Sequence, residues 1–286
     1  MPFRDLYRRQ GALLVRMLPH VAQEKAFALK GGTAINLFIR NMPRLSVDID
    51  LTYLPVHERV ASLAAIEAGL RRIAAAAKKD IGAEITEAST EGRVTKLLVR
   101  ADGVQIKIEV TPVIRGCVFE ARMRDVAPLV EETFGFVEMQ LVSFPDLYAG
   151  KAVAGLDRQH PRDLFDWRDL LANEGIGDEL RRAFLVYMVS HDRPMFEVLA
   201  PRRKDISELF ARDFDGMTDK PVTIEELIAA REALISGMVG DMPDSHREFL
   251  LSFERGKPKT ARNIASRLSR TRKTGITREY RIARHV

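Results

Sequence analysis

The stretch SVDIDLTYL, which begins at Ser46, alternates apolar and polar side chains with a period of two residues. Its first apolar residues share one face: Val47, Ile49 and Leu51. Asp48 and Asp50 share the opposite face, because successive side chains of a strand point to opposite sides. The pattern predicts a strand with one buried face, and therefore a sheet that carries two carboxylates side by side on its other face.

A glycine pair stands shortly before this strand, in the stretch LKGGTAINLFIRN. Gly31 and Gly32 allow the backbone to approach a ligand closely. The residues that follow predict a helix beginning near Thr33, and a helix N-terminus attracts phosphate through its free N–H groups and its dipole. A nucleoside triphosphate could then lie with its phosphate tail on these amides and its α-phosphate over Asp48 and Asp50.

The rest of the chain shows a change of pattern near residue 143. Before it, residues 3–25 predict a helix, and the strand-like stretches VTKLLVRA and VQIKIEVTPV are separated by the turn signal Asp102-Gly103. After it, one amphipathic helical stretch follows another. We therefore expect an α+β fold: an α/β domain over 1–142, a helical domain over 143–254 and a tail over 255–286.

The net charge of +5 is unevenly distributed along the chain. Residues 255–286 hold 11 Lys or Arg and one acid, Glu279, which leaves 34 basic and 39 acidic residues in the remainder. A basic tail of this kind is either a solvated end or an arm for nucleic-acid phosphates. A single cysteine, Cys117, excludes an internal disulfide and suits the cytoplasm, and no run of apolar residues is long enough to cross a membrane.

A third acid completes the expected cluster. Glu109 lies on the polar face of VQIKIEVTPV together with Gln105 and Lys107. Three clustered carboxylates repel one another unless cations neutralise them, and a site made only of oxygen ligands suits Mg²⁺ or Mn²⁺. Such ions could activate an attacking hydroxyl and stabilise a leaving pyrophosphate, which is the logic of nucleotidyl transfer.

The combined motifs resemble the nucleotidyltransferase toxins of the AbiEii/AbiGii type, which are related to the MenT toxins. The resemblance lies in R-x-S-x-D-I-D-L from Arg44, in IKIEVTP from Ile106, and in DLYAGKAVAGLDRQHPRDLFDW from Asp146. It covers about residues 27–170. It implies a polymerase-β-like nucleotidyltransferase core with a mixed sheet, followed by a C-terminal helical domain.

The resemblance also implies roles for particular residues. Asp48 and Asp50 would be catalytic metal ligands, and Glu109 would be the third ligand. Lys151 and Asp163 would both be catalytic residues of this pocket, and Lys151 would reach the phosphates of the nucleotide. The nucleotide would also contact the small residues of the two motifs: Gly31, Gly32, Thr33 and Ser46. From the residues alone, Lys151 also fits a solvated helix face, and Asp163 fits an acid favoured at a helix N-terminus.

The expected activity is Mg²⁺-dependent (or Mn²⁺-dependent) transfer of a nucleoside monophosphate from an NTP to RNA. The resemblance implies the 3′ end of tRNA as the acceptor, growth arrest as the outcome and a cognate antitoxin as a partner. Two alternatives stay open. One is nucleotidyl or phosphoryl transfer to a protein or to a small molecule such as an aminoglycoside, and the other is a non-catalytic nucleotide- or RNA-binding module.

Overall fold

The computed structural model describes residues 5–257, except for the side chains of residues 112–114. The chain divides into two compact units. The first consists of Met1–Ser143 and Phe210–Val222, and the second of Phe144–Leu209 and the residues from Thr223 onward. The change of pattern near residue 143 therefore coincides with a boundary, whereas the sequence does not indicate that Phe210–Val222 groups with the first unit.

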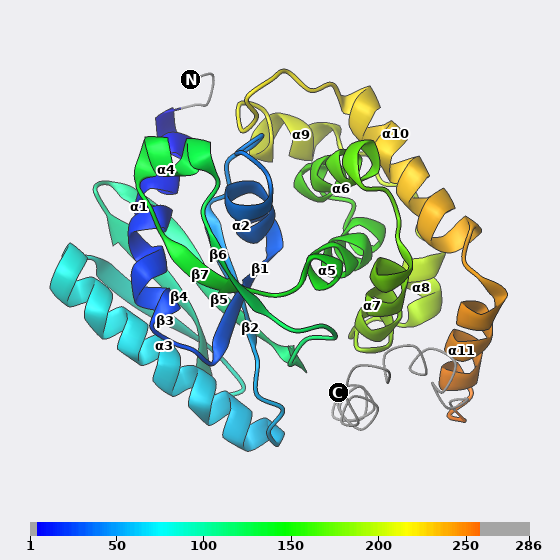
Figure 1. Ribbon diagram of the computed structural model, residues 1–286, viewed down its shortest axis with the longest axis horizontal. Helices are drawn as coiled ribbons and strands as arrows, with labels where there is room; N and C mark the ends of the chain where they lie inside the picture. Colours follow the sequence, from blue (N-terminus) through cyan, green and yellow to red (C-terminus); the bar gives the residue numbers. More distant parts are fainter. Residues whose placement is uncertain (1–4, 258–286) are drawn as a thin grey trace. The chain divides into compact units, whose positions relative to one another are not determined.

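The first unit is built around one sheet with helices on it (Figure 1). Its elements are α1 (Asp5–Ala22), β1 (Phe27–Lys30), α2 (Gly31–Ala34), the π-helical η1 (Ile35–Ile39), β2 (Asp48–Tyr53), α3 (Arg59–Ile81), β3 (Glu84–Thr90), β4 (Arg93–Ala101), β5 (Val104–Arg115), β6 (Arg122–Asp125), α4 (Pro128–Phe134) and β7 (Glu138–Leu141).

The seven strands form one mixed sheet in the order β3-β4-β5-β2-β1-β7-β6. The pairs β2/β5 and β1/β7 are parallel, and the other neighbours are antiparallel. This confirms the expected α+β class with a mixed sheet. The strand with the two aspartates, β2, lies at the centre of the sheet between β5 and β1.

The two faces of the central strands differ in character, as the period-two pattern predicts. Ile49 and Leu51 of β2 are fully buried, and α1 and α3 pack against the sheet (Figure 1). On α3, Gly69 lets the helix approach the ring of Phe27, because a β-carbon there would lie 2.8 Å from it. The opposite face of the same strands carries the charged residues that form the candidate site.

The predicted turn between β4 and β5 is confirmed. Asp102 and Gly103 have φ angles of 51° and 70°, which are the left-handed values that a two-residue hairpin turn requires. Glu91 and Gly92 form the equivalent connection between β3 and β4, with φ angles of 52° and 72°. From the turn at Asp102-Gly103 the register of β4 and β5 is unbroken, whereas the register of β3 and β4 shifts between Ala88 and Ser89.

The helix after β1 begins earlier than the sequence predicts. Its first residue is Gly31, not Thr33, and α2 passes into the π-helical η1 at Ile35. Gly31 has a φ angle of +73°, which glycine adopts without steric cost. The glycine pair therefore forms the first turn of the helical segment.

The segment Phe210–Val222 is attached to the first unit through backbone hydrogen bonds to the loop before β2. The N–H of Leu45 donates to the carbonyl of Met217 at 2.8 Å, and the N–H of Asp219 donates to that of Pro43 at 3.0 Å. An isolated antiparallel bridge joins Arg44 to Thr218 between them. This loop leads directly into the strand with the two aspartates.

The second unit is helical, as expected. Its elements are α5 (Phe144–Asp157), α6 (Pro161–Asn173), α7 (Asp178–Val189), α8 (Met195–Leu199), α9 (Ser207–Asp213), α10 (Ile224–Ile235), the π-helical η2 (Ser236–Gly240) and α11 (Asp244–Glu254), with α9 crossing the boundary into the first unit. Large aromatic side chains fill its core, and four of them are fully buried: Tyr148, Phe165, Trp167 and Phe184.

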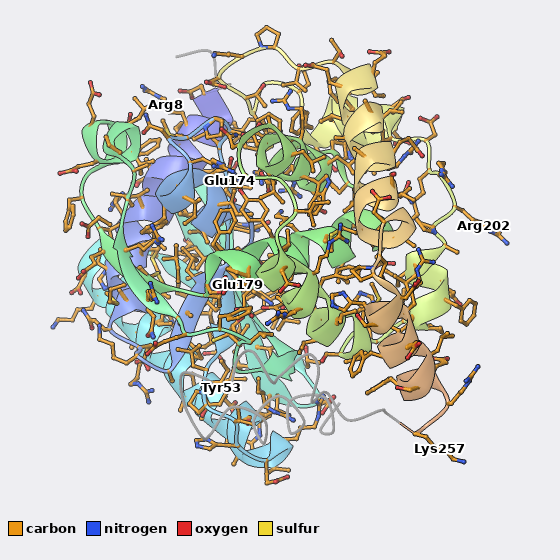
Figure 2. The ribbon with its side chains drawn as sticks, turned by 45° about the vertical axis from the view of Figure 1, so that its right-hand side comes forward. Arg8, Tyr53, Glu174, Glu179, Arg202 and Lys257 are labelled. Carbon is orange, nitrogen blue, oxygen red and sulfur yellow. The ribbon has the colours of Figure 1, made fainter. Side chains whose placement is uncertain are left out.

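The expectation of a basic tail over 255–286 falls almost wholly outside the described residues. The last of these, Lys257, has an exposed side chain and is labelled in Figure 2. Among residues 5–257, no helix combines the length and the apolar character that a membrane crossing needs.

Candidate active site

Asp48 and Asp50 share the polar face of β2, as the sequence predicts. Both side chains are half-buried, and the residue between them, Ile49, is fully buried on the other face. Because they are two residues apart on one strand, both carboxylates stand on the same side of the sheet.

The strand register brings further charges beside them. Asp50 is aligned with Lys30 of β1 on one side and with Glu109 of β5 on the other. Glu109 is in turn aligned with Lys96 of β4. A row of charges thus crosses four neighbouring strands, and we call it the charged row: Lys30, Asp50, Glu109 and Lys96. One step along β2, Asp48 is aligned with Lys107 of β5.

Glu109 is ion-paired through both of its carboxylate oxygens. Its Oε1 lies 3.1 Å from the Nζ of Lys96, and its Oε2 lies 2.9 Å from the Nζ of Lys107. Burial alone would raise the pKa of Glu109, but the two lysines hold that pKa below its ordinary value. Burial alone would lower the pKa of Lys107, but the neighbouring carboxylates, Glu109 first among them, raise it.

Lys30 differs from the other lysines of this face. Burial lowers its pKa below the ordinary value, and the opposing effect of Asp50 and Glu109 does not cancel the shift. It is half-buried at the end of β1, immediately before the glycine pair.

The glycine pair lies against charged side chains of this site. A β-carbon on Gly31 would lie 2.7 Å from Oδ2 of Asp50, and one on Gly32 would lie 2.6 Å from Nη2 of Arg44. Real β-carbons essentially never approach other heavy atoms so closely. Arg44 itself is 1% exposed and donates to the carbonyl of Leu45 at 2.9 Å. The two glycines therefore give room to an aspartate and to a buried arginine.

Thr33 and Ser46 connect the helical segment to β2. The Oγ1 of Thr33 lies 2.9 Å from the Oγ of Ser46, and the Thr33 hydroxyl donates to the backbone carbonyl of Asp48. Both side chains are buried, Thr33 with 1% and Ser46 with 6% exposure. These contacts fix the position of Asp48 relative to the glycine pair. Direct contact of either hydroxyl with a nucleotide stays a prediction.

The fit of a divalent cation rests on the donor atoms of this face. Asp48 and Asp50 offer oxygen ligands side by side, and Mg²⁺ is commonly held by one or two carboxylates together with substrate phosphates. The pair therefore fits such an ion. Within residues 5–257, no three His, Cys, Asp or Glu side chains are grouped so that they could hold a metal ion. The role of Glu109 as a third ligand stays a prediction.

Lys151 and Asp163 meet in the second unit. The Nζ of Lys151 lies 2.7 Å from Asp163 and 2.9 Å from Asp166, and these three side chains are at most 8% exposed. Arg158 also pairs with Asp163, through its Nε at 2.5 Å. Burial alone would raise the pKa of Asp163, but Lys151 and Arg158 outweigh it and hold that pKa far below its ordinary range.

The predicted site residues therefore form two groups, one in each unit. The first unit brings together Gly31, Gly32, Thr33, Ser46, Asp48, Asp50 and Glu109. The second brings together Lys151 and Asp163. Sequence reasoning missed Lys96 and Arg158. A signal for Lys96 existed, because a two-residue turn at Asp102-Gly103 places it opposite Glu109.

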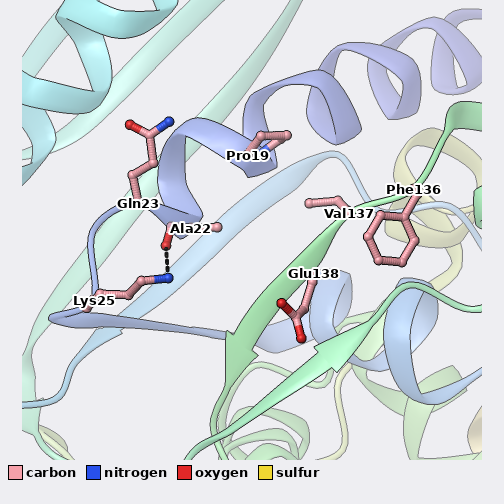
Figure 3. A pocket seen from close by; sticks show the side chains of 7 residues that line it. All are labelled: Pro19, Ala22, Gln23, Lys25, Phe136, Val137 and Glu138. Carbon is pink, nitrogen blue, oxygen red and sulfur yellow. Dashed lines mark hydrogen bonds between the residues drawn. The ribbon is translucent and has the colours of Figure 1, made fainter.

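A shallow hollow of about 520 Å³ lies elsewhere in the first unit, between the end of α1 and the start of β7 (Figure 3). Its lining is mostly apolar: Pro19, Ala22, Gln23, Lys25, Phe136, Val137 and Glu138. It contains no residue of the charged row or of the glycine pair. The candidate active site is therefore the charged face of β1, β2 and β5 and not this hollow.

Comparisons with known proteins show the fold and the family of the chain. No curated protein matches the chain. Among solved structures, the chain is similar to MenT4, described as nucleotidyltransferase toxin Rv2826c from Mycobacterium tuberculosis H37Rv. The TM-score is 0.64 with 16% sequence identity, and the match covers 85% of this chain and 87% of MenT4, which shows a shared fold. A sequence profile described as "Nucleotidyl transferase AbiEii toxin, Type IV TA system" matches residues 12–267, and the chain therefore belongs to the AbiEii family of nucleotidyltransferase toxins.

Proposed function

We propose that this nucleotidyltransferase transfers a nucleoside monophosphate from an NTP to RNA in a Mg²⁺-dependent reaction, with the 3′ end of tRNA as the acceptor. The observation that carries the proposal is the placement of Asp48 and Asp50 on one face, beside the glycine turn and three lysines. This arrangement offers anionic ligands for a cation and cationic groups for phosphates at neighbouring positions.

Each part of the site has a task in this proposal. Bound Mg²⁺ would supply charge neutralisation to the triphosphate, with Asp48 and Asp50 as its protein ligands. The first N–H groups of the helical segment, at Gly31 and Gly32, have no partner within the helix and suit phosphate oxygens. Lys107 and Lys30 supply compact positive charge on the same face.

The bond changes follow from the substrates. The oxygen of the RNA 3′-hydroxyl attacks the α-phosphorus, the bond from that phosphorus to the bridging oxygen breaks, and pyrophosphate leaves. The hydroxyl proton passes to a carboxylate of the Asp48–Asp50 pair. Positioning and electrostatic stabilisation supply most of the catalysis in such transfers.

The most specific part of the proposal is the identity of the acceptor, RNA. The family places the chain in the toxin half of a toxin–antitoxin system, which implies an antitoxin partner. The excess of 11 basic residues over one acid in 255–286 supports an RNA acceptor, because Lys and Arg neutralise backbone phosphates. Both RNA and NTPs are cytoplasmic, and we propose that the protein acts there.

The test incubates purified protein with each α-³²P-labelled NTP, Mg²⁺ and total bacterial RNA, followed by a denaturing gel. We expect label in a tRNA-sized band. Asp48→Asn should lower labelling by more than about 100-fold, since loss of a mere outer-shell partner of a metal already reduces activity 10–100-fold. Asp125→Asn is the matched control, because Asp125 is an exposed strand aspartate of the same unit.

The other outcomes separate the alternatives. Label found in protein or in an added aminoglycoside would show that this molecule, and not RNA, is the acceptor. Transfer of label from a γ-labelled NTP to the acceptor would indicate phosphoryl transfer. Growth arrest by Asp48→Asn equal to that by wild type would favour a binding module. Deletion of residues 258–286 should weaken labelling of RNA at physiological salt, and equal labelling without them would remove the tail from the proposal.

A further inference from the structure

The carboxylate of Glu109 has an ammonium group on each of its two oxygens. Lys96 approaches Oε1 from β4, and Lys107 approaches Oε2 from two residues before it on β5, at 3.1 and 2.9 Å. All three side chains are only about one-third exposed: Lys96 34%, Lys107 30% and Glu109 29%. Ion pairs in such partly buried surroundings are screened less by salt than surface pairs are.

The register makes this arrangement part of the active site and not a separate surface feature. Glu109 is aligned with Asp50, and Lys107 is aligned with Asp48. The face therefore carries three carboxylates and three lysines: Asp48, Asp50, Glu109, Lys30, Lys96 and Lys107. The lysines already balance the carboxylates in number.

A cation that binds here meets two different environments. At Asp48 and Asp50 it would find two adjacent carboxylates on one strand, which are aligned with Lys107 and Lys30 respectively. At Glu109 it would have to settle beside the ammonium groups of Lys96 and Lys107, and like charges at such short distances repel each other strongly.

We infer that Lys96 and Lys107 neutralise Glu109, so that the site binds one divalent cation on Asp48 and Asp50, and Lys107 supplies the positive charge that a second cation would otherwise supply. Lys96 then acts on the metal site only through Glu109. This inference rests on the proposed metal-dependent function, and it specifies how many ions that function uses.

The test counts bound Mn²⁺ directly, without an activity assay. Full-length protein is titrated with Mn²⁺ alone, and the free ion is measured from its electron paramagnetic resonance signal. We expect one bound ion per wild-type chain, lost in Asp50→Asn. In the double variant Lys96→Met/Lys107→Met, Glu109 loses both counter-charges, and we expect a second bound ion. Adding Glu109→Gln to that double variant should return the count to one.

A matched control separates the local effect from the change in net charge. Lys78→Met/Lys79→Met also removes two positive charges, but from exposed positions near the end of α3. The number of bound Mn²⁺ ions should stay at one. Circular dichroism checks that each variant is folded. If the double variant at 96 and 107 does not fold, the wild-type count alone decides between one ion and two.

The possible outcomes test the one-cation inference separately from the proposed metal-dependent function. Two ions on wild type, or one ion on the folded 96/107 double variant, would overturn the inference and leave the metal-dependent function standing. No Mn²⁺ binding by wild type, or binding unchanged in Asp50→Asn, would overturn both. A second ion that persists in the triple variant would also overturn the inference, because Glu109 would not be its ligand.

Discussion

The backbone of Gly31 lies directly against the carboxylate of Asp50. A β-carbon on Gly31 would lie 2.7 Å from Oδ2 of Asp50 and 3.2 Å from its Cβ, and Gly31 also has a φ angle of +73°. Two separate physical demands therefore meet at one residue. One is a left-handed backbone conformation, and the other is space for a candidate metal ligand.

The first prediction is that Gly31→Ala lowers activity by much more than its loss of stability explains. The positive φ angle should lower the free energy of unfolding by about 1–2 kcal/mol. The new methyl group must also displace the Asp50 carboxylate, and a misplaced catalytic group about 1 Å away can cost roughly 100-fold in rate. Urea denaturation and the RNA-labelling assay measure the two effects separately.

Gly92→Ala is the matched control for this change. Gly92 lies in the β3–β4 turn with a φ angle of +72°, and nothing lies within 4 Å of the position of a β-carbon there. It should lose a similar amount of stability and keep its activity. Equal activity of folded Gly31→Ala and Gly92→Ala proteins would show that the contact with Asp50 has no catalytic consequence.

The second prediction concerns the buried contact between Thr33 and β2. Thr33→Val keeps the shape of the side chain but removes the hydroxyl that contacts the Ser46 hydroxyl and donates to the backbone carbonyl of Asp48. Loss of a buried partner should lower the free energy of unfolding by about 1–3 kcal/mol. Thr33→Ser retains the hydroxyl and should recover most of that loss.

Nucleotide affinity separates this structural role from direct contact with the substrate. If Thr33 acts only by positioning β2, Thr33→Val should weaken Mn²⁺ binding and NTP binding together. A selective rise in the Kd for NTP, with unchanged Mn²⁺ affinity and unchanged stability, would instead support direct nucleotide contact by Thr33.

The sequence predicted the strand with Asp48 and Asp50 and the turn between β4 and β5, because these signals are local. The alternation around Asp48 and Asp50 and the turn at Asp102-Gly103 each depend on residues close together in the chain. The pairing of Glu109 with Lys96 depends on the register of β4 and β5, which the turn at Asp102-Gly103 fixes. The prediction of a three-carboxylate cluster did not use this register, and it therefore missed Lys96.

Other features could not be predicted, because tertiary contacts decide them. The helical segment begins at Gly31, where the backbone lies against the side chain of Asp50, a residue of a neighbouring strand. Backbone hydrogen bonds between residues far apart in the chain, such as that from Leu45 to Met217, attach Phe210–Val222 to the first unit. No local pattern in the sequence predicts a contact between residues so far apart.

The third prediction concerns Lys151, which pairs with both Asp163 and Asp166. Lys151→Met removes the ammonium and leaves two buried carboxylates with less compensation, which should lower the free energy of unfolding by about 3–5 kcal/mol. Arg203→Gln breaks a surface pair with Glu232 and should change it by less than about 1 kcal/mol. Urea denaturation at pH 7 compares the two.

Substrate binding then tests the further role expected of Lys151. A folded Lys151→Met protein that binds NTP as tightly as wild type would show that this lysine has only a structural role. Weaker NTP binding, with Mn²⁺ affinity retained, would support the predicted contact with phosphates.

The fourth prediction is a pH dependence of stability that originates at Asp163. Lys151 and Arg158 hold the pKa of Asp163 far below the value of about 3.9 expected in the unfolded chain. The unfolded state therefore binds more protons in acid. The contribution of Asp163 is fully present above the unfolded pKa and is lost as the pH falls below about 5, with a limiting slope of about 1.4 kcal/mol per pH unit.

Urea denaturation between pH 6 and pH 3 measures this slope. Asp163→Asn should be less stable than wild type at pH 6, and the difference should shrink as the pH falls, because asparagine takes up no proton. Arg158→Gln removes the more exposed of the two counter-charges and should reduce the slope by a smaller amount. Parallel pH profiles of wild type and Asp163→Asn would contradict the prediction, since they would mean that Asp163 binds protons equally in the folded and unfolded chains.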